Sequence, residues 1–171
     1  MTAPTVSPQL IAWASTARYA FTPEDDSGAA LFWTNPGGET RLYIRQAKDA
    51  FVLTQADRAS EEYFRLSSPE LDTIERYLYS EFGADSRLLS NLPRVKTPTK
   101  ATEVAVGYQI DESDPDGFRV LFDAKGNPVA TARGRVSGMS TLVELSHLVS
   151  SSLEDIIASY RDPEGLPLFH I

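Results

Sequence analysis

The sequence predicts an α+β fold of two β-meander-plus-helix halves, a mostly antiparallel sheet with helices packed on it. Three observations lead to this prediction: short strand-like runs alternate with turn residues, a long amphipathic helix follows the first group of runs, and a similar order returns after residue 100. We therefore expect a single domain over residues 1–171, with possible halves at 1–83 and 101–171 joined by a linker at 84–100.

A first helix is expected close to the N-terminus. Ser7 is a typical N-cap residue, and Pro8 fits the first helical turn, where its missing N–H costs nothing. Apolar residues then recur at helical spacing, namely Leu10, Trp13, Ala14 and Ala17. We expect this helix to end near Tyr19.

The first meander follows an acidic loop. Strand-like runs lie at 29–34, 40–45 and 50–54, and the residues Asn35-Pro36-Gly37-Gly38 between the first two favour a tight reversal. Residues 62–66 form a possible short fourth strand.

A longer helix should complete this half. Ser68 is expected as its N-cap, Pro69 in its first turn and Gly83 just past its end. Its apolar face would comprise Leu71, Ile74, Leu78 and Phe82.

The second half begins with an extended stretch at 103–110, followed by strands at 118–122 and 128–133. Turn residues at 114–117 and 125–127 separate them. The pattern of strand, turn and strand is thus repeated.

Two helices should end the second half. Thr141 with Glu144 and Ser151 with Glu154 each match a capping box. The first of these segments is short and could instead be a strand. In that case the two halves would match element for element, which suggests an internal repeat; convergence of two ordinary units explains the pattern equally well.

Composition excludes several classes of function. The absence of cysteine removes thiol catalysis, disulfides and thiolate metal sites. The N-terminus has neither a basic flank nor an apolar run, and no apolar stretch approaches the roughly 18–20 residues of a membrane span. We expect a soluble, unexported, cytoplasmic protein without a membrane partner.

The net charge of −8 is unevenly distributed. Residues 1–83 carry 7 basic and 12 acidic residues, residues 84–100 carry 4 and 1, and residues 101–171 carry 5 and 11, so the three segments have net charges of −5, +3 and −6. Such a field repels phosphate backbones and attracts basic proteins. Nucleic acid is therefore not an expected partner, although acidity can also serve only to keep a protein soluble.

The sequence shows no catalytic signature. His147 lies in an apolar helical run and His170 is penultimate, and neither has a plausible metal-binding partner. The paired carboxylates at Glu24-Asp25-Asp26 and Glu61-Glu62 lie in polar runs that look solvated, whereas acid–base catalysis needs perturbed pKa values. We expect no enzyme, no cofactor and no metal.

One segment resembles a calcium loop. Glu112, Asp114 and Asp116 alternate before Gly117, and Asp123 closes the segment. Glu in the first position, Asp in the last position and strand-like flanks all depart from the usual pattern, so an ordinary acidic turn is the favoured interpretation.

Aromatic residues are the remaining indication of a binding surface. In an alternating strand Tyr43 faces away from Leu42 and Ile44, which leaves exposure and packing against the first helix equally open for its side chain, whereas packing is favoured for Trp33. An exposed aromatic surrounded by acidic side chains would suit a basic protein partner.

Several fold-defining patterns occur together: Leu10-Ile11-Ala12-Trp13-Ala14, Leu31-Phe32-Trp33, Gly37-Gly38-Glu39-Thr40-Arg41, Leu53-Thr54-x-Ala56-x-Arg58, Ile74-Glu75-Arg76-Tyr77-Leu78-Tyr79 before Phe82-Gly83, and Asp162-Pro163-Glu164-Gly165-Leu166-Pro167-Leu168-Phe169. On these patterns, which cover most of the chain, the sequence resembles the bacterial immunity-protein family that includes the immunity factor for tuberculosis necrotizing toxin. The resemblance implies an antitoxin that binds a cognate secreted NAD-glycohydrolase toxin one-to-one and blocks its active site, so that the producing cell keeps its NAD.

Charge and exposure, rather than the resemblance, give the candidate toxin-binding residues. These are Glu24, Asp25, Asp26, Tyr43, Asp111, Glu112, Asp114 and Asp116. The alternative is a small hydrolase or ligand-binding protein whose pocket residues are scattered along the sequence.

Overall fold

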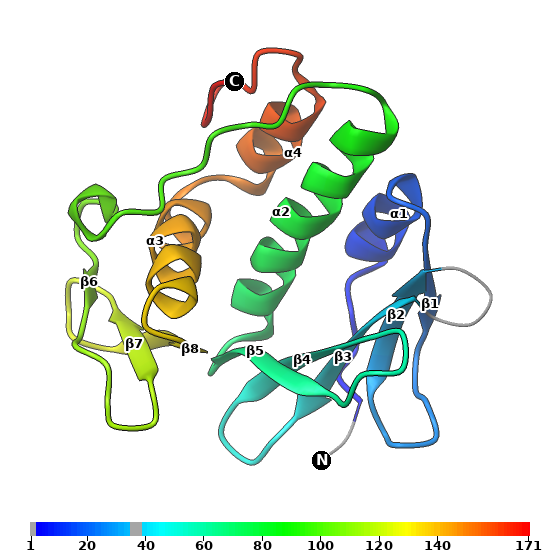
Figure 1. Ribbon diagram of the computed structural model, residues 1–171, viewed down its shortest axis with the longest axis horizontal. Coiled ribbons are helices and arrows are strands. Elements are labelled where there is room, and N and C mark those ends of the chain that lie inside the picture. The colour runs from blue at the N-terminus through cyan, green and yellow to red at the C-terminus, as the bar shows by residue number, and fades with distance from the viewer. Residues whose placement is uncertain (1–2, 35–38) are drawn as a thin grey trace.

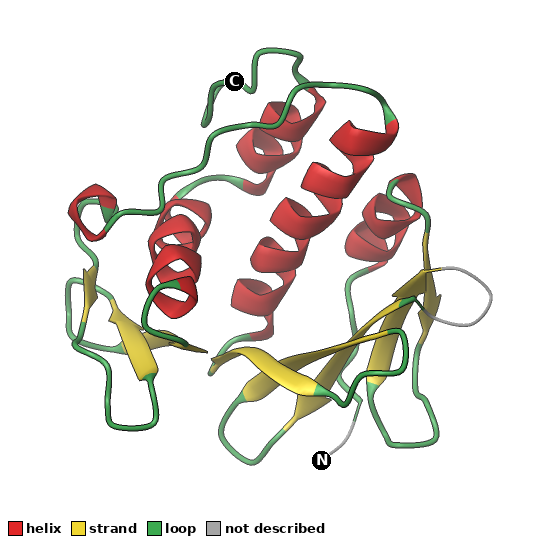
Figure 2. Ribbon diagram, in the orientation of Figure 1, coloured by secondary structure: helices red, strands yellow, loops and turns green. Residues whose placement is uncertain are grey.

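The computed structural model describes residues 3–34 and 39–171, and it consists of one sheet with helices on one side of it (Figure 1). The sheet has eight strands in the order β1-β2-β3-β4-β5-β8-β7-β6, and all neighbouring strands pair antiparallel. Figure 2 shows the separation of the helices from the strands. The α+β prediction is confirmed.

The N-terminal helix is shorter than expected. Helix α1 spans Pro8–Thr16, and the Ser7 hydroxyl accepts a hydrogen bond from the Leu10 N–H, as the sequence predicts. The helix ends before Tyr19 because Arg18 has a φ of 63°, which reverses the chain. Strand β1, Tyr19–Thr22, follows directly and was not expected.

The first meander matches the prediction closely. Its strands are β2 (Ala30–Thr34), β3 (Thr40–Gln46), β4 (Phe51–Asp57) and β5 (Tyr63–Ser68), so the short fourth strand is confirmed. The predicted turn at residues 35–38 lies outside the described residues.

Both predicted ends of the long helix are wrong. Helix α2 spans Leu71–Leu89 with Glu70 as its N-cap residue. Ser68 instead ends β5, where its hydroxyl donates to the Val129 carbonyl oxygen and accepts from the Glu70 N–H. Gly83 lies inside the helix, so residues 84–89 of the expected linker continue α2.

The second half is smaller and more helical than the first. Its elements are the short 3₁₀ helix Ala101–Glu103, β6 (Gln109–Ile110), β7 (Phe118–Phe122), β8 (Pro128–Arg133), α3 (Ser137–Ser150) and α4 (Leu153–Arg161). Helix α3 starts four residues before Thr141, and Ser152 rather than Ser151 caps α4. Because α3 is a helix and not a strand, the two halves do not match element for element.

A narrow junction joins the strands of the two halves. Strand β5 pairs with β8 through Leu66 opposite Ala132 and Ser67 opposite Thr131. The sheet is therefore continuous across residues that lie far apart in the sequence, while the division into halves at residues 84–100 stays a prediction.

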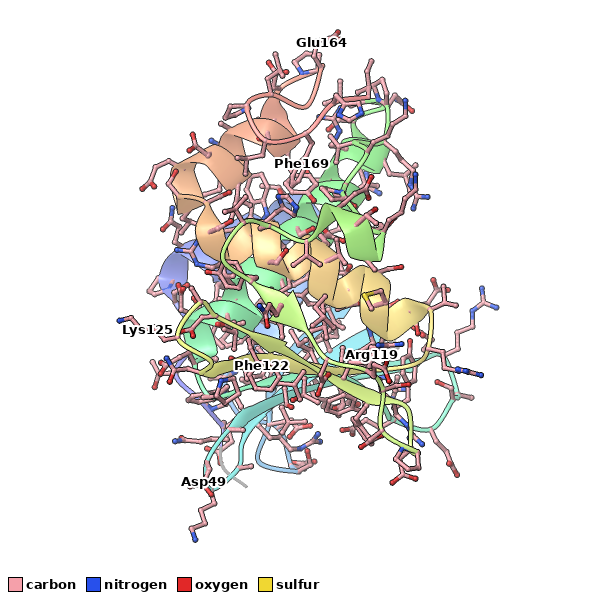
Figure 3. All side chains as sticks on the ribbon, turned by 90° about the vertical axis from the view of Figure 1, so that its left-hand side faces the viewer. Asp49, Arg119, Phe122, Lys125, Glu164 and Phe169 are labelled. Carbon is pink, nitrogen blue, oxygen red and sulfur yellow. The ribbon has the colours of Figure 1, made fainter. Side chains whose placement is uncertain are left out.

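The core fills the space between the sheet and the helices. Phe82 of α2 packs in tilted geometry against Phe32 of β2, with ring centroids 5.0 Å apart, and against Tyr19 of β1 at 4.6 Å. Phe169, near the C-terminus, packs on Tyr160 of α4 at 5.5 Å and closes the helix layer. Figure 3 shows Glu164 and Asp49 at opposite ends of the molecule, with the core between them.

Candidate functional site

The sheet has a second face that the helices do not cover (Figure 1). Successive strand residues point to opposite sides, and the large buried residues of the strands face the helices, whereas the small Ala56, opposite Arg41, is buried on the other side. The side chains on the other side form a surface that we call the open face. It comprises Leu31, Trp33, Arg41, Tyr43, Arg45, Val52, Thr54, Ala56, Phe64, Ser67, Phe118, Val120, Thr131 and Arg133.

A row of side chains crosses the open face perpendicular to the strands. Tyr43 pairs with Leu31 on one side and with Thr54 on the other, and Thr54 pairs with Phe64. Direct cross-strand neighbours have Cβ atoms about 4.5–5.5 Å apart, so these side chains contact one another. The row lies at the centre of the sheet, and Tyr43 is partly exposed within it, in line with the sequence prediction.

A β-bulge in β5 extends this row into the second half. The register shifts between Leu53 and Thr54, which leaves Arg65 as the extra residue of β5. Arg65 turns to the helix side, where it binds the Tyr77 hydroxyl and Glu81 of α2. Phe64 is thereby placed on the open face, with its ring centroid 5.4 Å from that of Phe118 in edge-on geometry.

Arginine side chains flank this row of Leu31, Tyr43, Thr54, Phe64 and Phe118. Arg45 lies over the Tyr43 ring at 5.0 Å and forms an ion pair with Glu62. Burial acts to raise the pKa of Glu62, but hydrogen bonds from Arg45 and Thr54 outweigh it and hold the pKa below its ordinary value. Arg133 lies over the Phe118 ring at 5.2 Å. These contacts orient the guanidinium groups along the surface.

The acidic loop at residues 24–26 connects β1 to β2, and its three carboxylates differ in role. Asp25 Oδ1 accepts hydrogen bonds from the Ser27 and Ala29 N–H groups, both 2.9 Å long, so Asp25 shapes the loop. Partial burial acts to raise the pKa of Asp25, but these hydrogen bonds hold it below its ordinary value. Glu24 and Asp26 are exposed. Two of the three predicted residues are thus free to contact a partner.

The second acidic loop, residues 111–116, connects β6 to β7. Asp111 Oδ1 accepts from the Val120 N–H at 2.6 Å, and Asp114 Oδ1 accepts from the Phe118 N–H at 2.8 Å. Glu112 and Asp116 are exposed and leave their carboxylates in solvent. Strands β1 and β6 are the two edges of the sheet, so the acidic loops lie at opposite edges and Tyr43 lies between them.

Two carboxylates of the segment that resembles a calcium loop, those of Asp114 and Asp123, are held by turn N–H groups. Asp123 accepts hydrogen bonds from the Lys125 and Asn127 N–H groups, as Asp114 does from Phe118. Within residues 3–34 and 39–171, no group of three or more acidic or histidine side chains is arranged to hold a metal ion.

A polar cluster in the helix layer was not apparent from the sequence. Ser80 of α2 donates to the Glu144 carboxylate of α3, and its oxygen lies 2.6 Å from the Tyr160 hydroxyl of α4. Burial is the largest cause that raises the pKa of Glu144, to about 7, and Glu81 adds to the effect. The cluster borders a cavity of about 230 Å³ that Arg94, Val95 and Thr97 also line. No signal in the sequence brings these three positions together, because each lies on a different helix.

The histidines have structural contacts. His147 Nε2 lies 2.7 Å from the Glu103 carbonyl oxygen, and the His170 carbonyl oxygen accepts from the Lys96 N–H at 2.6 Å. In the described part of the chain, no helix has the length and apolar character required to cross a membrane.

Comparisons with known proteins agree with this architecture. A family model described as Immunity protein 61 matches residues 13–168, so the chain belongs to this family of immunity proteins. It is 34% identical over 148 residues to the immunity factor for TNT of Mycobacterium tuberculosis and to its homolog in Mycobacterium bovis, covering 85% of this chain and 81% of each relative. The solved structure of Rv3902c from M. tuberculosis superposes with a TM-score of 0.87 at 30% identity, covering 97% of this chain and 94% of that one.

Proposed function

We propose that this immunity protein binds a cognate secreted NAD-glycohydrolase toxin one-to-one and blocks its active site in the cytoplasm of the producing cell. The observation that carries the proposal is the 34% identity to the immunity factor for TNT, spread over 81% of that relative. A stoichiometric inhibitor needs a rigid, complementary surface and no reactive group of its own. We accordingly propose that the chain does no catalysis.

The candidate contact residues remain those expected from charge and exposure. They are Glu24, Asp25, Asp26, Tyr43, Asp111, Glu112, Asp114 and Asp116. Their arrangement supports a broad contact, because the two acidic loops lie at opposite edges of the open face and Tyr43, on the third strand in sheet order, lies between them. Acidic residues at the rim of an interface mainly accelerate encounter with a basic partner.

The test is inhibition of a toxin encoded beside this gene. Purified chain and toxin should elute together with a mass equal to one copy of each, and NAD consumption should fall linearly to zero as the molar ratio approaches one. Absence of a complex at micromolar concentrations, with NAD consumption unchanged, would reject the proposal. Neither nucleic acid nor lipid vesicles should compete.

A second candidate function rests on the cavity beside Glu144. The raised pKa of Glu144 and the contact of its carboxylate with the Ser80 hydroxyl are features that acid–base catalysis also uses. A small hydrolase or ligand-binding protein would use this cavity. Turnover of NAD or of a simple ester by the isolated chain, lost in Glu144→Gln, would favour this candidate over the inhibitor.

A further inference from the structure

The open face is unusually apolar for the solvent side of an antiparallel sheet. Such a face normally carries polar side chains when only the other face is packed. Here Leu31 and Tyr43 on one side and Phe64 and Phe118 on the other lie in one row from β2 to β7, with Thr54 between the two pairs and Trp33 beside Leu31. All five apolar side chains remain partly exposed. Exposed apolar surface of this kind is typical of a binding site.

The charge on this face is opposite in sign to that of the whole protein. The molecule carries a net charge of −8, yet three arginines, Arg41, Arg45 and Arg133, lie on the open face. Arg45 is neutralised by Glu62. Arg41 and Arg133 donate only to main-chain carbonyl oxygens among the described contacts, so neither charge is paired with a carboxylate there.

We propose that the open face is the surface that docks the toxin, and that it accepts apolar side chains flanked by aspartate or glutamate carboxylates. This inference rests on the proposed function and names the surface that performs it. Aromatic residues and arginine are the residue types that carry most binding energy at protein interfaces. On the open face both residue types lie together on one sheet, and the helix layer packs against the other face of that sheet and holds the strands in place.

Single-stranded RNA is the competing class of ligand, because aromatic and arginine side chains on a sheet also bind unpaired bases. The surroundings of the face favour a protein. Exposed carboxylates of Glu24, Asp26, Glu112 and Asp116 lie in the loops at both edges and repel a phosphate backbone. A folded partner can instead place its own basic groups against these loops.

The first test uses two substitutions on the open face and two matched controls on the helix layer. Tyr43→Ala removes the central aromatic ring, and Arg133→Glu reverses an exposed charge. The controls are Leu88→Ala, at an exposed apolar position of α2, and Arg161→Glu, at an exposed arginine of α4. The dissociation constant for the neighbouring-gene toxin is measured by calorimetry, and the melting temperature of each variant checks its folding.

We expect Tyr43→Ala and Arg133→Glu each to weaken toxin binding by about 30-fold or more, and the controls to change it less than about threefold. If the wild-type chain binds the toxin but only the helix-layer variants weaken binding, the docking surface is wrong while the proposed function stands. If the wild-type chain does not bind the toxin, the proposed function itself fails.

A second measurement uses the unsubstituted protein and does not depend on a variant folding. Hydroxyl-radical footprinting should show that Trp33, Tyr43, Phe64 and Phe118 become protected from oxidation in the toxin complex. Unchanged oxidation of all four residues in a complex that inhibits the toxin would overturn the inference. Protection by a single-stranded oligouridine but not by the toxin would also overturn it, in favour of nucleic acid.

Discussion

The ring of Tyr160 in α4 occupies the space that a side chain at Gly83 of α2 would need. A Cβ atom built on Gly83 would lie 2.3 Å from Tyr160 Cγ, well inside van der Waals contact. The two helices can approach this closely only because position 83 has no side chain. The glycine in the middle of α2 therefore serves packing rather than helix termination.

Gly83→Ala should destabilise the protein by about 3 kcal/mol, although alanine is the better helix former, because the added methyl group forces α4 away from α2. Urea unfolding measures the change. In a Tyr160→Ala background the same substitution should cost clearly less, since the ring is gone and only the contact with the Cβ atom of residue 160, at 2.8 Å, remains. An equal loss in both backgrounds would show that helix contact is not the cause.

Arg87→Met should destabilise the protein by about 3 kcal/mol. The Arg87 side chain is 1% exposed and donates to main-chain carbonyl oxygens of Pro93, Tyr160 and Pro163, among others, so its loss leaves buried acceptors without donors. Thermal unfolding measures the effect. The matched control is Arg94→Met in the same region, where the arginine is exposed and the change should stay within about 0.5 kcal/mol.

Glu144→Gln should become increasingly stabilising, relative to the wild type, as the pH rises from about 4.5 to about 7. Burial raises the folded-state pKa of Glu144 to about 7 from its ordinary value of 4.5, so the unfolded chain releases this proton first and the wild type loses stability over that interval. The difference should reach roughly 3 kcal/mol at most and stay constant above pH 7.

Denaturant unfolding at pH 5, 6, 7 and 8 measures this difference. Glu154→Gln, which removes an exposed carboxyl group from α4, controls for the loss of one acid. A difference between Glu144→Gln and wild type that does not vary with pH would show that Glu144 ionises equally well in both states.

Glu24→Lys combined with Asp26→Lys should slow association with the toxin several-fold at low salt and change dissociation little, because rim charges act mainly on encounter. Asp25 is left intact because it shapes the loop. Stopped-flow association rates at several salt concentrations provide the measurement. The control pair, Glu154→Lys with Glu164→Lys, reverses two exposed charges, one in α4 and one in the turn after it. If both pairs of substitutions slow association equally, the net charge of the protein, rather than the position of the loop, would explain the effect.

The sequence predicted the strands well because alternation and turn residues are local signals. The same local rules failed where a tertiary contact took over. Ser68 and Gly83 match the usual residues of helix ends, but Ser68 is held in β5 by the Val129 carbonyl and Gly83 is required by Tyr160. Strand β1 was missed because it is short and follows an irregular turn at Arg18, which carries no signal that distinguishes it from a frayed helix end.

The candidate site was predictable only in part. The exposure of Tyr43 follows from strand alternation. The residues that surround Tyr43 on the open face do not follow from alternation. Phe64 reaches this face because of a bulge, and Phe118 reaches it because the strands of the two halves pair. Register and bulges depend on contacts between distant segments, so the aromatic row could not be assembled from the sequence.

Among the described residues, β5 and β8 pair in register at two positions, Leu66 with Ala132 and Ser67 with Thr131, and the Ser68 hydroxyl adds a hydrogen bond to the Val129 carbonyl oxygen. Because this junction between β5 and β8 is short, the helices that pack across it largely set the relative twist of the two parts of the sheet. The curvature of the open face thus depends on the helix layer on the other side of the sheet. Helix α2 packs on β4 and β5 and helix α3 packs on β7 and β8, so substitutions between α2 and α3 would tune recognition by reshaping that surface rather than by altering its chemistry.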